Sequence, residues 1–354
     1  MNITDQTYLP VLRWKGAEKA ALRALSPDIR SAIVPLIEFV PRDFWGSAEN
    51  AAINTVGKEV AENWGWKHPV IIDPHLLGDN TAGKNLYSVL RALARYNVSC
   101  GIVTDISRTD DYQQSLAEVL RKFPGLDLCF RINPIHLRLP GLDSALRELL
   151  TKLGRKLNDV HMIVDFRLIS EDGMNFGPAL SSLPMLEDWC SITALAGSFP
   201  KNLSHLAPNE QHFLPRGEWG SWCSLNERSS LLTAFGDYTI QHPFFEDREG
   251  KGSNISPSIR YTCPDGYLIM RGEGVKNKDG PGYEQWLAEA TILSEKSEFS
   301  GPSFCWGDTF IGDKSREPLN PGSIKDWLAA TMNHHLTLVA RQIREVKAPA
   351  QLRR

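Results

Sequence analysis

Residues 68–106, HPVIIDPHLLGDNTAGKNLYSVLRALARYNVSCGIVTDI, contain the repeating unit that decides the fold. The unit opens with the apolar run HPVIIDP and ends with a second run, SCGIVTDI. Between them, NLYSVLRALARY has apolar residues at the three- and four-residue spacing of an amphipathic helix. Short runs that are apolar almost throughout are typical of parallel strands buried on both faces. The stretch therefore predicts a strand, a crossover helix and a second, parallel strand.

The same unit recurs along the first two thirds of the chain. Helical stretches such as GAEKAALRAL, DDYQQSLAEVLRKF and DSALRELLTKLGRKL separate further apolar runs. The eight runs, each given with its first residue, are YLPVLRW (Tyr8), AIVPLIEF (Ala32), HPVIIDP (His68), SCGIVTDI (Ser99), LDLCFRI (Leu126), VHMIVDF (Val160), WCSITAL (Trp189) and AFGDYTI (Ala234). Because strand–crossover–strand connections share one hand, eight repeats predict an α/β fold, a closed (β/α)8 TIM-like barrel. An open doubly wound sheet is the alternative, although no GxGxxG motif follows the first strand.

The repeat of apolar runs and helical stretches ends near residue 242. This divides the chain into a barrel core, residues 1–242, and a C-terminal decoration with closing helices, residues 243–354. In the second part, SIRYTCPDGYLIMRGEG has alternating flanks around a Pro-Asp-Gly turn and predicts a β-hairpin. GYEQWLAEATIL and IKDWLAATMNHHLTLVARQI predict helices, and SFCWGDTFIGD predicts a short strand. Alternatively, this part supplies the last strand–helix unit, and one of the eight runs is then not a barrel strand.

Composition narrows the class of protein. The 354 residues are 42% hydrophobic and 23% charged, which excludes intrinsic disorder, and the formal net charge is −3. A charge so close to zero gives no general attraction to nucleic acid or membranes, so any anion site must be local. The opening residues lack the pattern of a signal peptide, no apolar run approaches the length of a membrane span, and the six cysteines form no CxxC pair. We therefore expect a cytoplasmic protein with reduced thiols and no membrane partner.

Polar side chains end nearly every apolar run. In chain order they are Arg13 and Lys15, Glu38, Asp73 and His75, Asp105, Arg131 and Asn133, Asp165 and Arg167, Ser198, and Asp237 and Gln241. The carboxyl ends of parallel strands meet at one rim of a barrel, and that rim carries the active site in barrel enzymes. We therefore expect a polar pocket there, with the carboxylates of Glu38, Asp73, Asp105 and Asp165 on the same rim.

Two kinds of ligand suit such a rim. Lys15 with Arg13 or Arg131 can bind a phosphate, because lysine is a compact charge and arginine a bidentate fork. Glu38, Asp73 and Asp105 are the candidate catalytic groups, as general bases or as hard oxygen ligands for Mg²⁺. No cofactor or metal is fixed by this spacing, and polar strand ends can equally be structural ion pairs.

The opening YLPVLRWKGAEKAAL resembles the start of the "beta protein" family, which is named after a bacteriophage protein. Further matches are VPLIEF around Glu38, YTCPDGYLIMRG, FCWGDTFI and DWLAATMNHHL. The matching charged residues are Arg13, Lys15, Glu38, Arg271, Asp308 and His335. Where the family pattern has an arginine after the tryptophan of the last motif, this chain has Leu328.

The resemblance implies a barrel fold and a setting in conflict between bacteria and phages, near anti-phage defence genes; it implies no reaction. It adds Arg271, Asp308 and His335 to the ligand-binding candidates Arg13, Lys15, Arg131 and Asp165. We expect Arg271 and Asp308, which end strand-like runs, to reach the rim and close one side of the pocket.

Two functions follow as hypotheses. The first is a rim pocket for a phosphate-bearing ligand, either a phosphorylated small molecule such as a nucleotide or a nucleic acid, with phosphoryl transfer or hydrolysis as its reaction if it is an enzyme. The second is a non-catalytic interaction or immunity protein that holds a protein partner encoded nearby. The ten tryptophans favour the second, because exposed tryptophans often anchor interfaces.

Overall fold

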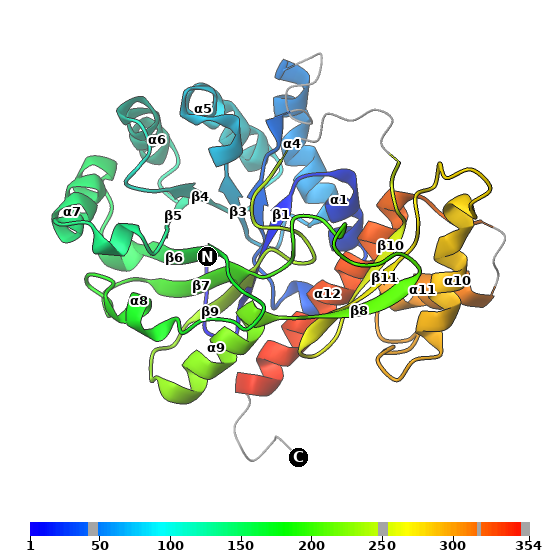
Figure 1. Ribbon diagram of the computed structural model, residues 1–354. Coiled ribbons are helices and arrows are strands. Elements are labelled where there is room, and N and C mark those ends of the chain that lie inside the picture. The colour runs from blue at the N-terminus through cyan, green and yellow to red at the C-terminus, as the bar shows by residue number, and fades with distance from the viewer. Residues whose placement is uncertain (42–48, 247–253, 317–319, 348–354) are drawn as a thin grey trace.

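Eight parallel strands close into a barrel in the computed structural model, which describes residues 1–41, 49–246, 254–316 and 320–347 (Figure 1). In barrel order the strands are β1 (Tyr8–Arg13), β2 (Leu36–Glu38), β3 (Val70–Asp73), β4 (Cys100–Thr104), β5 (Asp127–Ile132), β6 (Val160–Leu168), β7 (Ser191–Gly197) and β9 (Ala234–Asp237). Each strand coincides with one of the eight apolar runs. The prediction of a closed (β/α)8 barrel is confirmed, and the open doubly wound sheet is excluded.

Helices cover the outside of the barrel. In chain order they are α1 (Gly16–Arg23), α2 (Pro27–Arg30), α4 (Glu49–Asn63), α5 (Asp79–Arg95), α6 (Asp110–Lys122), α7 (Leu142–Leu153), α8 (Gly177–Ser181) and α9 (Gly217–Arg228), with the 3₁₀ turns η1 (His75–Leu77), η2 (His136–Arg138) and η3 (Leu157–Asp159). Their apolar faces pack on the strands, and a second apolar cluster that includes Leu9, Leu36 and Ile163 fills the interior. The interior of the barrel is therefore a packed core and not a pore.

An appended sheet lies beside the barrel (Figure 1). Its antiparallel strands, in order, are β10 (Ser258–Thr262), β11 (Gly266–Arg271) and β8 (Glu210–Pro215). The β10–β11 pair is the predicted hairpin. The sequence analysis missed β8, which lies between β7 and α9 in the chain, because most of this edge strand is exposed and it lacks an apolar run.

Helices η4 (Gly282–Glu284), α10 (Gln285–Ser294) and α11 (Trp306–Arg316) complete the appended part. The prediction of a strand at SFCWGDTFIGD was wrong, because most of this segment is α11. A side chain at Gly307 would lie 2.0 Å from the Ala330 carbonyl oxygen, so the glycine lets α11 approach the next helix closely. Tertiary packing thus outweighs the β propensity of the aromatic residues here.

The last helix, α12 (Ile324–Lys347), runs between the barrel and the appended sheet (Figure 1). It contacts α1 and β1 on one side and β10 on the other. Its residues Met332, Leu336 and Val339 belong to the same apolar cluster as the barrel helices. This helix therefore takes the place of the barrel helix that would follow the eighth strand, β9. The appended part supplies no barrel strand, so all eight predicted runs are barrel strands.

Two chain-wide properties complete the fold. Among the described residues, no helix combines the length and the apolar character needed to cross a membrane. The six cysteines are unpaired, and Cys129 and Cys263 are buried while Cys190 is exposed.

Candidate functional site

Arg131 occupies the centre of the barrel at the carboxyl ends of its strands. Its Nη1 donates to Glu38 Oε1 at 2.9 Å and to Asp73 Oδ2 at 2.6 Å, and its Nε donates to Asp165 Oδ2 at 3.0 Å. Its Nη2 donates to the Tyr238 hydroxyl at 2.8 Å. All five side chains are buried. We call them the Arg131 network.

Strand register places the network. Arg13, Glu38 and Asp73 are consecutive partners across β1, β2 and β3, so three charged side chains end neighbouring strands at one level. Arg131 comes from β5 and Asp165 from β6, on the other side of the barrel. Only the closure of the barrel brings Arg131 and Asp165 together with Glu38 and Asp73.

Arg108 extends the network outward on the side of β3. It forms ion pairs with Asp73 at 3.0 Å, with Asp79 at 2.7 Å and with Asp105 at 3.5 Å. Asp105 also accepts a hydrogen bond from the Ser107 amide at 2.6 Å. The expected convergence of the four strand-end carboxylates on one rim is therefore confirmed, whereas their catalytic role stays a prediction.

The network corrects two of the predicted ligand contacts. The nitrogens of Arg131 are satisfied by three carboxylates and a hydroxyl, so Arg131 does not present its guanidinium to a phosphate. Burial opposes the charge of Arg131, but Tyr238, Asp165 and Glu38 hold its pKa well above the ordinary value. Asp165 is likewise taken up by Arg131, Tyr238 and Arg167.

Among the described residues of the rim, Glu38, Asp73 and His75 could hold a metal ion, because one donor atom of each lies within 4.8 Å of the others. His75 Nδ1 is 3.3 Å from Asp73 Oδ1 and 3.7 Å from Glu38 Oε1. Burial raises the pKa of Asp73, but His75, Arg131 and Arg108 outweigh it and hold that pKa well below its usual range. The donors fit a divalent ion, although Arg131 already binds an oxygen of each carboxylate.

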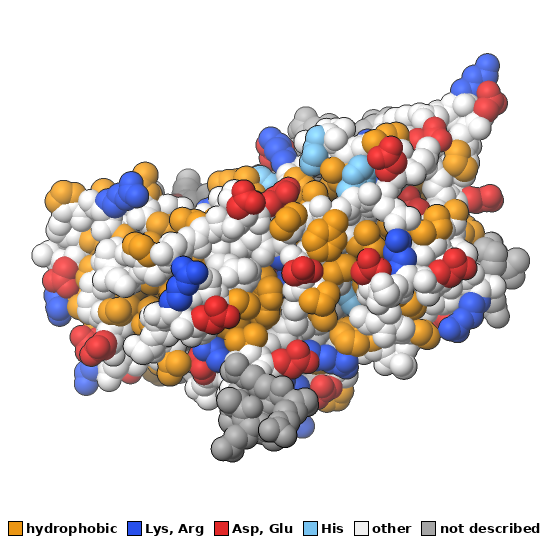
Figure 2. Space-filling model, turned by 60° about the horizontal axis from the view of Figure 1, so that its bottom comes forward, with side chains coloured by type: hydrophobic (Ala, Val, Ile, Leu, Met, Phe, Trp, Pro, Cys, Tyr) orange, Lys and Arg blue, Asp and Glu red, His pale blue; other side chains and the backbone are white. Residues whose placement is uncertain are grey.

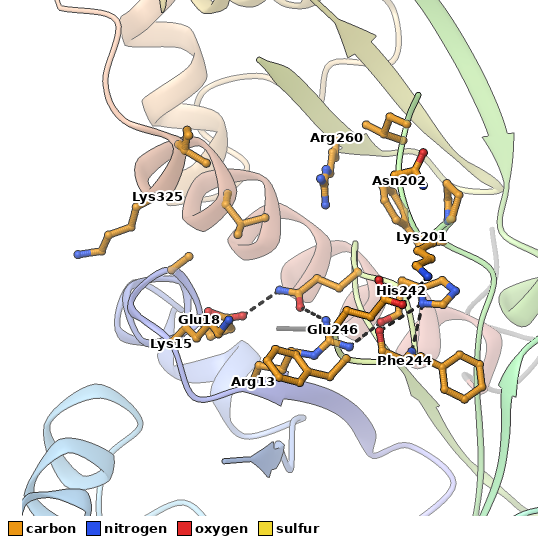
Figure 3. A pocket seen from close by; sticks show the side chains of 18 of the residues that line it. Arg13, Lys15, Glu18, Lys201, Asn202, His242, Phe244, Glu246, Arg260 and Lys325 are labelled. Atoms are coloured by element: carbon orange, nitrogen blue, oxygen red, sulfur yellow. Dashed lines mark hydrogen bonds and ion pairs between the residues drawn. The ribbon is translucent and has the colours of Figure 1, made fainter. Parts of the chain in front are cut away.

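A cavity of about 520 Å³ opens beside this network, between β1, α1, the 241–246 segment, β10 and the start of α12 (Figure 3). We call it the basic cavity. Its charged lining residues are five cations and two carboxylates: Arg13, Lys15, Lys201, Arg260, Lys325, Glu18 and Glu246. Figure 3 shows Arg13 and Arg260 on opposite sides of the space.

The cations of the basic cavity are held in different ways. Arg13 donates to Gln241 Oε1 at 3.0 Å and to the His242 carbonyl at 2.7 Å, and burial lowers its pKa. Lys15 Nζ lies 4.9 Å from the centre of the Phe245 ring. Lys201 is paired with Glu246, and Arg260 donates to the Ile240 carbonyl at 3.1 Å.

Glu18 is the buried acid of this cavity. Its Oε1 accepts from Gln241 Nε2 at 2.8 Å, and its Oε2 has no partner among the described residues. Burial raises the pKa of this carboxyl, and Gln241 offsets only part of that. Glu18 therefore takes up a proton more readily than an ordinary glutamate, which leaves the cavity more positive.

Three predicted ligand-binding residues lie outside the lining of the basic cavity. Asp308 is fully buried, where it accepts from the Tyr261 hydroxyl at 2.7 Å and lies 2.8 Å from His334 Nδ1. His335 is fully buried as well, 3.0 Å from Asp237 Oδ2. Arg271 donates to the Leu206 carbonyl in the appended part. The prediction that Arg271 and Asp308 close the pocket was therefore wrong, because the appended sheet lines the basic cavity with Arg260 instead.

The family motif DWLAATMNHHL ends in two adjacent histidines, His334 and His335, and both are buried. His334 and His335 both face inward. His334 contacts Asp308 of α11 and the Thr262 carbonyl of the hairpin, and His335 contacts Asp237 of the barrel, so the two residues tie α12 to all three. Burial lowers the pKa of His335, against the opposing effect of Asp237. Cys305, Asp308 and His334 also form a group with metal-ligand spacing, but burial and Asp308 raise the pKa of the Cys305 thiol, which disfavours the thiolate a metal needs.

Sequence reasoning missed Lys201, Arg260 and Lys325. Lys201 follows β7, Arg260 lies within the hairpin, and Lys325 is at the start of α12, so no common motif links them. The family resemblance singled out Arg13 and Lys15, but not the side chains opposite them. Only the packing of the appended sheet on the barrel reveals the full lining.

The surface gives less support to a protein partner. Among the described tryptophans only Trp66 and Trp306 are exposed. On the face shown in Figure 2, positive and negative side chains are interspersed. The excess of positive charge is thus a property of the basic cavity and not of that face.

Comparison with solved structures finds distant similarities. A mutant tryptophan synthase alpha-subunit from the hyperthermophile Pyrococcus furiosus shares 13% identity over 66% of this chain and 88% of its own, with a TM-score of 0.40. The active domain 2 of a chitinase from Pyrococcus furiosus shares 12% identity over 66% and 84%, with a TM-score of 0.39. These values are too low to carry a functional argument, and no curated protein matches the chain. The model of the Beta protein family, in contrast, matches residues 8–341, so the chain belongs to the Beta protein family.

Proposed function

We propose that the basic cavity binds a phosphate-bearing ligand, a nucleotide or a nucleic acid end. The observation that carries the proposal is the excess of cations over carboxylates on the wall of a 520 Å³ cavity in a chain whose net charge is −3. Cavities of this size are typical of small-molecule sites. Unmatched positive charge in a concave site attracts anions far more strongly than the same charge on open surface.

The lining has the two elements that phosphate recognition uses. Arginine offers parallel N–H donors and lysine a compact charge, and both are present on opposite walls. Gly16 and Ala17, the first residues of α1, also line the cavity, so the positive end of a helix dipole lies at its wall. Phe245 supports this arrangement, because both Arg13 and Lys15 lie over its ring.

Hydrolysis or phosphoryl transfer of the bound ligand is the second part of the proposal, and it depends on binding. Arg13 is the register partner of Glu38, so the basic cavity and the Arg131 network are neighbours. Glu38, Asp73 and His75 could then hold a divalent ion beside a bound phosphate, as in hydrolysis or phosphoryl transfer. The setting in phage conflict that family membership suggests is consistent with either binding or hydrolysis of nucleotides.

Binding is tested by calorimetry with adenosine triphosphate, inorganic phosphate, a single-stranded oligonucleotide and a DNA duplex. Lys15→Ala and Lys325→Ala should each weaken the ligand that binds by about tenfold, the effect of losing one charge-assisted contact. Lys84→Ala, an exposed lysine on α5, is the matched control and should change nothing. Phosphate release with and without Mg²⁺, in wild type and Glu38→Gln, tests the reaction.

Equal affinity in all the lysine variants, or no binding by wild type, would remove the proposal. An interaction protein would then be the better hypothesis. Ligand binding without phosphate release would leave a binding protein and discard only the reaction.

A further inference from the structure

A second cavity, of about 440 Å³, lies in the appended part and shares no lining residue with the basic cavity. It is bounded by the open edge of the sheet, β8 and the end of β11, and by α10, which packs beside the sheet in Figure 1. We call it the acidic cavity, because its charged lining residues are Glu210, Glu284, Glu289 and a single cation, Arg271.

Glu289 is the unusual member of this lining. Its side chain comes from α10 and the residue is only 8% exposed. Its Oε2 has no hydrogen-bond partner among the described residues. A buried carboxylate with an oxygen that lacks a hydrogen bond is unfavourable, so the group is either protonated or paired with a cation.

The electrostatics of Glu289 point the same way. Burial raises its pKa to about 9, although the Ile259 amide works in the opposite direction. The one cation of the lining, Arg271, donates instead to the Leu206 carbonyl. Without a ligand the carboxyl is therefore neutral at physiological pH.

The chain makes room for this acid. An ideal Cβ at Gly272 would lie 3.2 Å from Glu289 Oε1 and 2.3 Å from Gln285 Oε1. The glycine thus lets two polar side chains of α10 reach the end of β11. Gln285 is itself fixed, since it accepts from the Glu273 amide at 2.7 Å and donates to the Gly282 carbonyl at 2.6 Å.

Apolar surface completes the wall. Met270, Ala288 and Ile292 line the same cavity as the carboxyl groups. A ligand that satisfies both needs a positive nitrogen and a short aliphatic body. An alkylammonium group has both, with three donors on a compact charge.

We infer that the acidic cavity binds a primary alkylammonium group, with Glu289 as its counter-ion. The ammonium donates to the Glu289 carboxylate, the carboxyl gives up its proton to solvent, and the aliphatic chain lies along Met270 and Ile292. Glu210 and Glu284, at the more open side, favour cations in general. The site is independent of the basic cavity and of any phosphate ligand.

The test is calorimetric titration with n-butylamine at neutral pH, in two buffers that differ in ionisation enthalpy. Wild type should bind n-butylamine, should not bind n-butanol, and should release close to one proton for each amine bound. Titration with 1,5-diaminopentane and with Nα-acetyl-lysine amide distinguishes a free diamine from the lysine side chain of a protein.

Glu289→Gln keeps the shape and polarity of the protonated carboxyl, so it should fold normally. It should bind n-butylamine at least about tenfold more weakly and release no proton. Glu284→Gln, which removes a charge from the same wall without removing the buried acid, should change the affinity only slightly. Binding to wild type without proton release, equal binding by Glu289→Gln, or no binding by wild type at millimolar amine would each overturn the inference. A carboxyl carbon shift of Glu289 that fails to move with added amine would overturn it as well.

Discussion

The Arg131 network and the basic cavity lie side by side at the same end of the barrel, yet they treat charge in opposite ways. In the network each charged group is buried against groups of opposite sign, and Arg131 alone contacts three carboxylates. In the basic cavity the cations outnumber the carboxylates, and Lys201 with Glu246 is an ion pair within it. Matched buried charge indicates structure, whereas unmatched charge around an open space indicates a ligand. Arginine and glutamate therefore stabilise the fold in the Arg131 network, whereas in the neighbouring basic cavity the same residue types line a candidate ligand site.

The largest effect is expected in the Arg131 network, on the free energy of unfolding. Replacing Arg131 by methionine leaves the buried carboxylates of Glu38, Asp73 and Asp165 without their shared partner. We expect the free energy of unfolding to fall by about 3–5 kcal/mol, measured by chemical denaturation. Arg147→Met, which removes an exposed arginine on α7, should change it by less than about 0.5 kcal/mol. A similar small change in both variants would mean that the network does not stabilise the fold.

The second-largest effect is expected in the basic cavity. The double variant Lys15→Ala/Lys325→Ala should bind the phosphate ligand about a hundredfold more weakly, if two charge-assisted contacts add. Its thermal stability should stay close to that of wild type, because both lysines line an open cavity and are not buried in the core. A clear drop in melting temperature together with unchanged binding would place these lysines with the network instead.

Acid pH sharpens the comparison. The pKa of Asp73 is lowered in the folded protein, so its contribution to stability is present above the ordinary value of 3.8 and is lost as pH falls through the depressed value. Asp73→Asn should lower the free energy of unfolding by about 2 kcal/mol at neutral pH. The difference between wild type and Asp73→Asn, from urea denaturation at a series of pH values, should shrink only below pH 3.8. A difference that shrinks already near neutral pH would contradict the lowered pKa.

The smallest effect is a gain. Leu328 lines the basic cavity, at the position where the family pattern has an arginine. Leu328→Arg adds a cation to the wall and should tighten phosphate binding a few fold, by about 0.5–1 kcal/mol. Leu328→Met is the uncharged control for this comparison. Weaker binding by Leu328→Arg than by Leu328→Met would show that the charge of the cavity does not drive ligand affinity.

For the fold, much was predictable from the sequence. Each barrel strand is an apolar run, because a parallel strand buried on both faces needs apolar residues on both. β8 was missed because an exposed edge strand carries no such run, and α11 was predicted to be a strand because its aromatic residues favour strands. Local pattern thus predicted the elements with buried faces and failed where tertiary contacts decide.

The sequence by itself also determined that Arg13, Lys15, Glu38, Asp73 and Asp165 lie at or near the carboxyl ends of barrel strands, since strand ends can be read from the apolar runs. The tertiary structure alone decided which of these charges are neutralised. Arg131 lies on the strand β5 but is satisfied by groups from β2, β3 and β6, and Arg260 enters the cavity from a hairpin that follows the barrel strands. The reason is physical: the effect of a charge depends on its distance to other charges and to water, and sequence spacing does not fix either distance.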